Sequence, residues 1–412
     1  MKQLGPFLLL ICGCIQDLTV LTPIDGSVDT GTIDAESPEI GVFDGLSLPS
    51  DVGIPVVPLF AFGRRLATGL DHGCAIRNDG VLRCWGLNEH GQLGVGDTEP
   101  RNEPVALPDL WFEVSADGNS TCGIKQDGTL WCWGQNREGG LGQNDTLDRF
   151  VPTEVAVPCS VQQIAVGANH VCAQAENGKL YCWGANEEGQ LGQQDTPTTP
   201  LVFRSPTELT GTWDFVSAGS GHSCAIDVDG RLFCWGRNTQ SQLGLGNEAA
   251  QERKPTRVGR KRWRYVTASQ AYSCGITTNE DLFCWGNGEF GRTARGNQQV
   301  RDTPGRTLSP FDGYQQLSSG WFSACGVRAD RSVWCWGRNT EGQLGLGETE
   351  DRDRPHQMPN VAAQDVAVGR FFTCVLTVEG RVACTGRNSS SQLGVSLSED
   401  QVSSLIFQNG WR

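Results

Sequence analysis

The 412-residue chain contains only five histidines, four tyrosines and two methionines. Histidine is the usual general base and a frequent zinc ligand, so its scarcity leaves few candidates for either role. The sequence also offers no nucleophile paired with a base, no metal-ligand spacing and no phosphate-binding glycine motif. We therefore expect a protein that is not an enzyme and that needs no metal and no cofactor.

Positive charge is the second shortage, because 33 lysines and arginines face 47 acidic residues and leave a net charge of −14. Binding to DNA or RNA depends on neutralising phosphates with basic side chains. This composition therefore excludes nucleic acid as the expected partner.

The N-terminus has only a short apolar run, Phe7 to Ile11, which follows Met1 and Lys2. The run is too short to cross a bilayer as a finished helix and is typical of an export signal. Ile11-Cys12-Gly13-Cys14 resembles the bacterial lipobox, although Cys12 stands where that pattern usually has a small or β-branched residue. We expect residues 1–13 to be a signal peptide and Cys14 to carry a lipid anchor in the outer membrane or at the cell surface. Ordinary secretion is the alternative.

Residues 14–60 lack lysine and arginine altogether and contain eight acidic residues among Ser, Thr, Gly and Pro. Such a segment cannot bury enough apolar area to offset the entropy of ordering. We expect a flexible tether, followed by a folded domain over residues 61–412.

Cysteine and glycine are abundant instead, with 17 and 53 residues, and 13 tryptophans accompany them. So many thiols favour an oxidising compartment. A unit such as HGCAIRNDGVLRCWG occurs seven times, with its first cysteines 48 to 52 residues apart. A period in this range indicates a propeller or a solenoid.

Each unit reads as a β-hairpin, because apolar and polar residues alternate on both sides of a turn such as Asn78-Asp79-Gly80. Counting outward from that turn places the two cysteines of a unit directly opposite each other, within reach of a disulfide. Buried free thiols and zinc binding are the alternatives. The predicted pairs are Cys74 with Cys84, Cys122 with Cys132, Cys172 with Cys182, Cys224 with Cys234, Cys274 with Cys284, Cys325 with Cys335 and Cys374 with Cys384. Outside them, we expect Cys159 to be a free thiol.

A second signature follows the hairpin, as in WGLNEHGQLGVGD and WGRNTEGQLGLGE. With the turn, the Trp-Gly pair, the Asn and the Gly-Gln-Leu-Gly run, these units resemble the repeat of the regulator of chromosome condensation family. The resemblance covers about 350 residues. It implies an all-β fold, a seven-bladed propeller of four-stranded blades around a central channel. The nucleotide exchange known in that family is not expected of an exported, acidic, disulfide-bonded chain.

Three units depart from the pattern. The fifth replaces Gly-Gln-Leu-Gly with Gly291-Arg292-Thr293-Ala294, the fifth and sixth lack the turn glycine, and the seventh has Thr385 for tryptophan. We expect distorted hairpins there. Ring closure is expected to use one terminal strand, from residues 54–57 or from residues 404–407.

Two polar residue types recur in register and are interpreted as structural. Three histidines stand two residues before a first cysteine, and six asparagines follow the Trp-Gly pair, where their amides would fix the loop. These residues are His72, His170, His222, Asn88, Asn136, Asn186, Asn238, Asn339 and Asn388.

Aromatic residues precede the first cysteine only in the last three units. Equivalent loops of neighbouring blades lie side by side, so these side chains would form one exposed patch for a protein partner. Packing between the blades is the alternative. The residues are Tyr272, Trp321, Phe322, Phe371 and Phe372.

Basic residues concentrate in one link, between the fourth and fifth units. Clustered arginines can hold phosphate or carboxylate groups. An anionic contact and an ordinary solvated link are both compatible with Arg253, Lys254, Arg257, Arg260, Lys261, Arg262 and Arg264.

The expected function is a monomeric, envelope-anchored module that binds a protein, and a glycan or small-ligand binder using the same face is the alternative.

Overall fold

The computed structural model divides the chain into two units, Met1–Ala61 and Phe62–Arg412. It describes residues 63–412 except 194–199, 248, 398, 410 and 412. The predicted signal peptide, Cys14 and the acidic tether lie outside the described residues. No helix in the described part is both long and apolar enough to cross a membrane.

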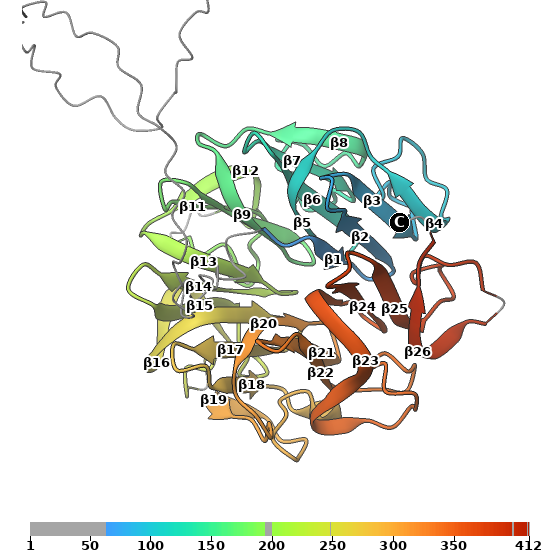
Figure 1. Cartoon of the computed structure of the whole chain (residues 1–412). Coiled ribbons are helices and arrows are strands. Elements are labelled where there is room, and N and C mark those ends of the chain that lie inside the picture. The colour runs from blue at the N-terminus through green and yellow to red at the C-terminus, as the bar shows by residue number, and fades with distance from the viewer. Residues whose placement is uncertain (1–62, 194–199, 248, 398, 410, 412) are drawn as a thin grey trace, which may run out of the picture. The chain divides into compact units, whose positions relative to one another are not determined.

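The second unit is the predicted seven-bladed β-propeller, and the all-β fold class is confirmed. Figure 1 shows the blades following one another round a ring, from blue to red. Blades one to three consist of β1 (Leu66–Thr68), β2 (His72–Ile76), β3 (Leu82–Gly86), β4 (Arg101–Ala106), β5 (Trp111–Asp117), β6 (Ser120–Lys125), β7 (Leu130–Gly134), β8 (Arg149–Val155), β9 (Val161–Val166), β10 (His170–Ala175), β11 (Leu180–Ala185) and β12 (Val202–Leu209).

Blades four to seven share two long strands, β16 and β23, each of which leaves one blade as its outer strand and enters the next as its inner strand. A single 3-10 turn among the described residues, η2 (Glu289–Gly291), lies in blade five. The strands are β13 (Trp213–Ala218), β14 (His222–Asp227), β15 (Arg231–Arg237), β16 (Gln251–Ala268), β17 (Tyr272–Thr277), β18 (Leu282–Gly286), β19 (Arg301–Arg306), β20 (Tyr314–Ser319), β21 (Ser323–Arg328), β22 (Ser332–Gly337), β23 (Arg352–Val368), β24 (Phe372–Thr377), β25 (Val382–Arg387) and β26 (Gln401–Phe407).

Antiparallel pairing within every blade gives the ring two distinct faces. The connections from first to second strand and from third to fourth strand end on one face, which we call the loop face. The hairpin turns between second and third strands, together with the links between blades, end on the other, which we call the turn face.

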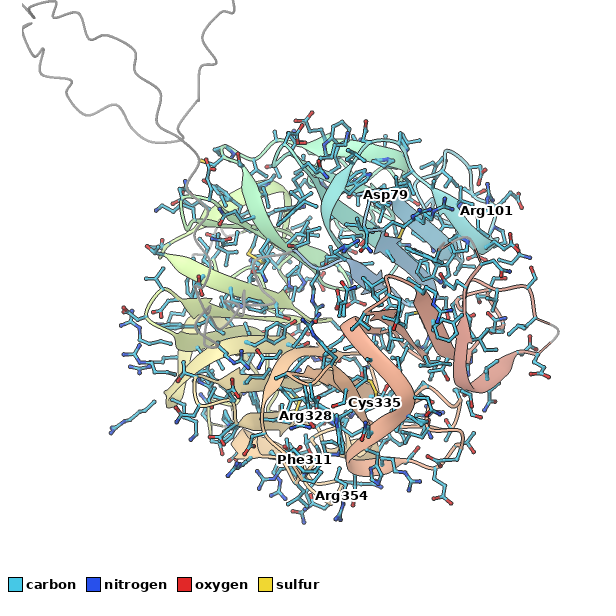
Figure 2. The ribbon with its side chains drawn as sticks, in the orientation of Figure 1. Asp79, Arg101, Phe311, Arg328, Cys335 and Arg354 are labelled. Atoms are coloured by element: carbon cyan, nitrogen blue, oxygen red, sulfur yellow. A yellow bond between two sulfur atoms is a disulfide. The ribbon has the colours of Figure 1, made fainter. Side chains whose placement is uncertain are left out.

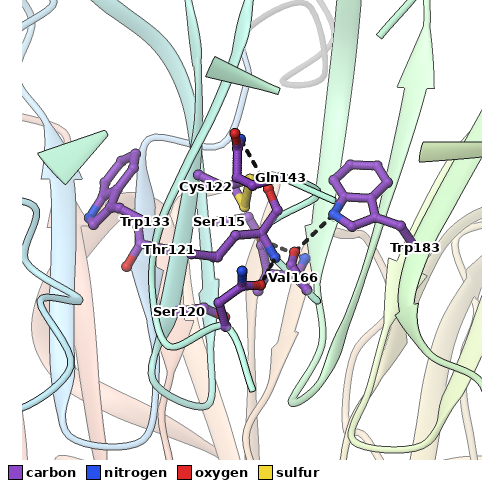
Figure 3. Close-up of a disulfide and its surroundings, with 12 residues drawn as sticks. Ser115, Ser120, Thr121, Cys122, Trp133, Gln143, Val166 and Trp183 are labelled. Atoms are coloured by element: carbon purple, nitrogen blue, oxygen red, sulfur yellow. Dashed lines mark hydrogen bonds between the residues drawn. A yellow bond between two sulfur atoms is a disulfide. The ribbon is translucent and has the colours of Figure 1, made fainter. Parts of the chain in front are cut away.

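The central hairpin of each blade has the predicted register, with the two cysteines as direct partners, as in Cys122 and Cys132. All seven predicted disulfides are present. The alternatives of free thiols and zinc are therefore wrong for these residues. Figure 3 shows Cys122 between the neighbouring blades.

Cys159 does not agree with the sequence-based prediction. It is disulfide-bonded rather than a free thiol, and it accepts a hydrogen bond from Asn177 Nδ2 at 3.2 Å. The hairpin register could not indicate this, because Cys159 lies outside the repeated pairs.

The repeated tryptophan joins consecutive blades. Its indole N–H donates to a backbone carbonyl in the glycine-rich loop of the preceding blade, as from Trp235 to Gln190 (2.8 Å) and from Trp183 to Gly140 (2.8 Å, Figure 3). In blade seven the hydroxyl of Thr385 makes the equivalent bond to Gly342 at 2.9 Å. The substitution of threonine for tryptophan thus keeps the contact between blades.

The inner strands are linked in a second way. An inner strand leaves backbone N–H groups unpaired on its channel side, and a side chain from the preceding blade accepts from them. Ser115 Oγ accepts from Val166 N (3.1 Å), Ser217 Oγ from Ala268 N (2.9 Å) and Ser318 Oγ from Val368 N (3.0 Å).

The recurrent asparagines fix the loop after the Trp-Gly pair, as predicted. The side-chain oxygen of Asn88 accepts from Leu93 N at 3.0 Å, and its Nδ2 donates to Asp97 O at 2.9 Å. The same bond to the leucine amide is made by Asn136, Asn186, Asn238, Asn339 and Asn388.

The expected distortion of the hairpins in blades five and six is wrong. Their cysteines pair in the same register as elsewhere. Glu280 and Arg331 occupy the position of the turn glycine and adopt its left-handed conformation, at φ of 66° and 68°. The turn therefore keeps its shape and the non-glycine residue carries the strain.

Among the described strands, none is exchanged between blades to close the ring. Residues 404–407 belong to β26, which pairs with β25 as the ordinary outer strand of blade seven, and residues 54–57 lie outside the described residues. Blade one instead packs against blade seven. Trp85 donates to Gln392 O at 2.9 Å, and its ring meets Trp411 edge to face, with centroids 6.4 Å apart.

Candidate functional site

Two of the five aromatic residues predicted to form an exposed patch are core residues. Tyr272 and Phe372 are completely buried. Tyr272 donates to Ser323 O in the next blade at 2.7 Å, and Phe372 packs among Leu66 and Trp85 of blade one. Both occupy the position of His72, His170 and His222, whose rings contact the neighbouring blade, so exposure was the wrong expectation for them.

The other three aromatics do lie together on the loop face. Phe322 and Phe371 stack with centroids 5.5 Å apart, and Trp321 meets Phe322 edge to face at 6.2 Å. Trp321 and Phe322 are partly exposed, whereas Phe371 is 7% exposed and packs against Phe322. The patch is therefore smaller than predicted.

Phe290 is a fourth member, which sequence reasoning missed. Its ring lies 5.8 Å from that of Phe322. It belongs to η2, and its φ of 61° is unfavourable for a bulky side chain. The available signal was the replaced Gly-Gln-Leu-Gly run of blade five, directly after this aromatic residue.

Four arginines surround these rings, and the sequence pattern did not indicate them. Arg338 lies 5.3 to 5.4 Å from the centroids of Phe290, Phe322 and Phe371. Arg370 lies 4.7 Å from Trp321 and 4.8 Å from Phe371. The full set, which we call the loop-face cluster, is Phe290, Arg292, Trp321, Phe322, Arg338, Arg370, Phe371 and Arg387.

Two of the four guanidinium groups are neutralised by carboxylates. Arg292 pairs with Glu289 at 3.0 Å and Arg387 with Glu341 at 2.9 Å. The Arg338 guanidinium donates to the Thr340 hydroxyl at 2.8 Å, and neither Arg338 nor Arg370 has an ion pair among the described residues. Asp71 lies near Arg370 and Arg387; burial raises its pKa and the two arginines oppose that rise.

The cluster borders the central channel, which contains a cavity of about 90 Å³. Trp321 and Arg370 line its mouth, together with Asp117, Ser269 and Ser319. Trp321 Nε1 and Arg370 Nε are both buried and have no hydrogen-bond partner among the described residues. Desolvation raises the pKa of Asp117 to about 6.

Arg64 also lines the cavity and joins the blades around it. Its guanidinium donates to Tyr265 Oη at 2.7 Å and to Leu317 O at 2.5 Å. Burial raises the pKa of the neighbouring Glu113 to about 8, and Glu113 Oε1 accepts from Ile164 N at 2.9 Å. These satisfied contacts indicate a structural role.

The seven basic residues of the link lie along β16, which crosses from blade four to blade five. Arg253 donates to Glu187 O at 2.7 Å, and Arg264 donates to Gln315 Oε1 at 3.1 Å. The exposed members are Lys254, Arg257, Arg260, Lys261 and Arg262. Four of these exposed residues lie around the crossover of β16 at the turn face, and Lys254 lies further back along the strand. Their anionic contact stays a prediction.

The turn face has an aromatic site of its own, with fewer charges. Phe311 is 50% exposed, meets Trp334 edge to face at 5.5 Å, and lies 4.9 Å from the guanidinium carbon of Arg328 (Figure 2). Arg328 is paired with Asp330 at 3.0 Å. The turn-face site is therefore charge-balanced, in contrast to the loop-face cluster.

The fold, the repeated loops and the shared indole bonds define a disulfide-bonded propeller of fifty-residue repeats. The chain belongs to the RCC1-like domain family, because a model of that domain matches residues 41–358 and a model of the regulator of chromosome condensation (RCC1) repeat matches residues 363–392.

Similar proteins have varied roles. The ultraviolet-B receptor UVR8 of Arabidopsis thaliana is 28% identical over 301 residues, which cover 71% of this chain and 57% of that protein. The probable E3 ubiquitin-protein ligase HERC3 of Homo sapiens is 27% identical over 37% of this chain and 10% of that protein. The chain thus spans little more than half of UVR8 and a tenth of HERC3.

Among solved structures, yeast RCC1 (Prp20) bound to Kap60 is similar with a TM-score of 0.72. The two chains are 17% identical, and the match covers 91% of each. At that identity the likeness supports the fold alone.

Proposed function

We propose that this chain is an exported, envelope-anchored propeller that binds a protein through its loop face, as a monomer and without catalysis. The observation that carries the proposal is the loop-face cluster, where partly exposed Trp321 and Phe322 stand beside Arg338 and Arg370, which make no ion pair within the described part of the chain. Aromatic residues and arginine are the side chains most often responsible for binding energy at protein interfaces.

Seven disulfides within the propeller support export, since such bonds persist in oxidising compartments. The relative whose structure was solved with Kap60 supports protein binding as one use of this fold. The likeness to a probable ligase covers a tenth of that protein and gives no support for catalysis here.

The binding proposal is tested by photocrosslinking on intact cells. A photoreactive phenylalanine analogue replaces Trp321 in the full chain, and the matched control carries it at Phe311 on the turn face. We expect one protein adduct that forms from position 321 and is absent from position 311. Equal adducts from both positions, or none from position 321, would place the partner elsewhere.

Anchoring is tested separately by replacing Cys14 with alanine. A lipid on the Cys14 sulfur and a disulfide from Cys159 to that sulfur would exclude each other. If Cys14 carries the lipid, Cys14→Ala moves the protein from the membrane fraction to the soluble one. An unchanged distribution on immunoblots of the two fractions would support ordinary secretion or another anchor.

A further inference from the structure

We propose that the loop-face cluster binds a carboxylate-rich segment of the protein partner, with Arg338 and Arg370 as the receiving groups. The inference rests on the proposed function and names the chemistry of the same site. It requires that the partner present aspartate, glutamate or a C-terminal carboxylate to the mouth of the channel.

The local charge balance is the first argument. The whole chain carries a net charge of −14, and four guanidinium groups converge here near the paired carboxylates of Glu289 and Glu341, the more distant Asp71, and Asp117 at the mouth. Arg338 and Arg370 make no ion pair among the described residues, and such groups in an otherwise acidic protein attract an acidic ligand locally while the rest of the surface repels it. Such an arrangement selects the docking position of an acidic partner.

The position of the guanidinium groups is the second argument. The guanidinium carbons of Arg338 and Arg370 lie 4.7 to 5.4 Å from the ring centroids around them. Contacts of this kind help to hold the planar group in place, and a guanidinium group packed against rings still has N–H donors for a hydrogen-bond acceptor. A carboxylate is the acceptor whose two oxygens match that edge.

Unsatisfied donors at the channel mouth are the third argument. Arg370 Nε and Trp321 Nε1 are buried without an acceptor, and both residues line the cavity. Buried donors in folded proteins are nearly always hydrogen-bonded. Two donors without an acceptor, on residues that line a cavity, therefore fit an acceptor that a ligand supplies. A carboxylate at the mouth would lie beside both residues.

The size of the cavity and the state of the rings favour a protein segment over a sugar. About 90 Å³ accommodates one carboxylate side chain or a few water molecules. Each ring of the cluster already has a guanidinium carbon 4.7 to 5.4 Å from its centroid, which leaves less open ring surface for a sugar. Trp321 and Phe322, which are partly exposed, can instead contact apolar residues next to the carboxylate.

The test is a selection of random heptapeptides displayed on phage, carried out on the full chain. Peptides selected by the wild type should be enriched in aspartate and glutamate. Arg338→Gln/Arg370→Gln should lose that enrichment and bind a selected peptide about tenfold more weakly. The matched control is Arg137→Gln/Arg204→Gln, which removes two exposed charges of blades two and three and should bind within about twofold of the wild type.

Three results would overturn the inference. Selection of peptides without acidic enrichment would exclude carboxylate recognition. An equal loss of peptide affinity in both double variants would mean that the overall charge of the protein, and not this site, attracts the peptide. Binding of polysialic acid that depends on Arg338 and Arg370, without acidic peptides, would assign the site to a glycan.

Thermal unfolding of each variant confirms that it is folded. If Arg338→Gln/Arg370→Gln still forms the adduct at position 321, the protein-binding proposal stands and only the carboxylate inference fails.

Discussion

At the scale of single residues, one position of the repeat decides whether a side chain is buried. The residue two places before the first cysteine faces the next blade, whether it is His72, Tyr272 or Phe372, and all three are fully buried. His72 Nε2 lies 2.8 Å from Thr121 Oγ1, which itself donates to Gln92 O at 2.9 Å. Because the Thr121 hydroxyl uses its hydrogen in the bond to Gln92 O, it can only accept from His72. His72 therefore carries its hydrogen on Nε2, and its Nδ1 is unprotonated.

This geometry predicts a pH effect that His72→Gln should remove. Burial lowers the pKa of His72 from 6.5 to about 3. With a lowered pKa in the folded state, the unfolded chain takes up the proton first as the pH falls. The contribution of His72 to the free energy of unfolding is therefore fully present above pH 6.5 and is lost as the pH falls towards 3. Between pH 8 and 5 we expect the wild type to lose about 2 kcal/mol of unfolding free energy more than the variant.

Urea unfolding of both proteins across that pH range measures the difference. Glu113 acts in the opposite direction, since burial raises its pKa to about 8, but it is present in both proteins and cancels. Parallel curves for the two proteins would mean that the pKa of His72 is nearly the same in the folded and unfolded states and that burial does not lower it.

At the scale of elements, the hairpins were predictable because their register is local. The turn and ten residues of separation between the cysteines determine which side chains are opposite, so all seven disulfides follow from spacing alone. The shape of the turns in blades five and six was not predictable, because loss of glycine could distort the turn or strain the replacement. The cross-blade packing keeps the turn, and Arg331 is strained at φ 68°.

Restoring glycine at this turn should therefore stabilise the protein. Arg331→Gly relieves the left-handed conformation, and we expect a gain of about 0.5 to 1 kcal/mol in the free energy of unfolding. The reverse change, Gly230→Arg at φ 74°, should cost a similar amount. Chemical unfolding of the two variants measures both signs, and a loss of stability in Arg331→Gly would refute the strain.

At the scale of the whole molecule, the ring brings together residues that the repeat separates. Arg292, Arg338 and Arg387 come from three different blades, and no spacing rule links them to Trp321. The aromatic half of the site could be expected from the sequence, since equivalent loops adjoin on one face. The charged half and the burial of Tyr272 and Phe372 depend on packing between blades, which the sequence of one blade does not specify.

The central claim is that partner binding depends on the exposed aromatic residues of the loop face. Its most direct measurement is the affinity of the crosslinked partner for Trp321→Ala, with Phe311→Ala as the turn-face control. The account predicts that Trp321→Ala weakens binding about thirtyfold, while Phe311→Ala binds as the wild type does and both variants unfold at nearly the wild-type temperature. Unchanged affinity in a folded Trp321→Ala protein would contradict the account.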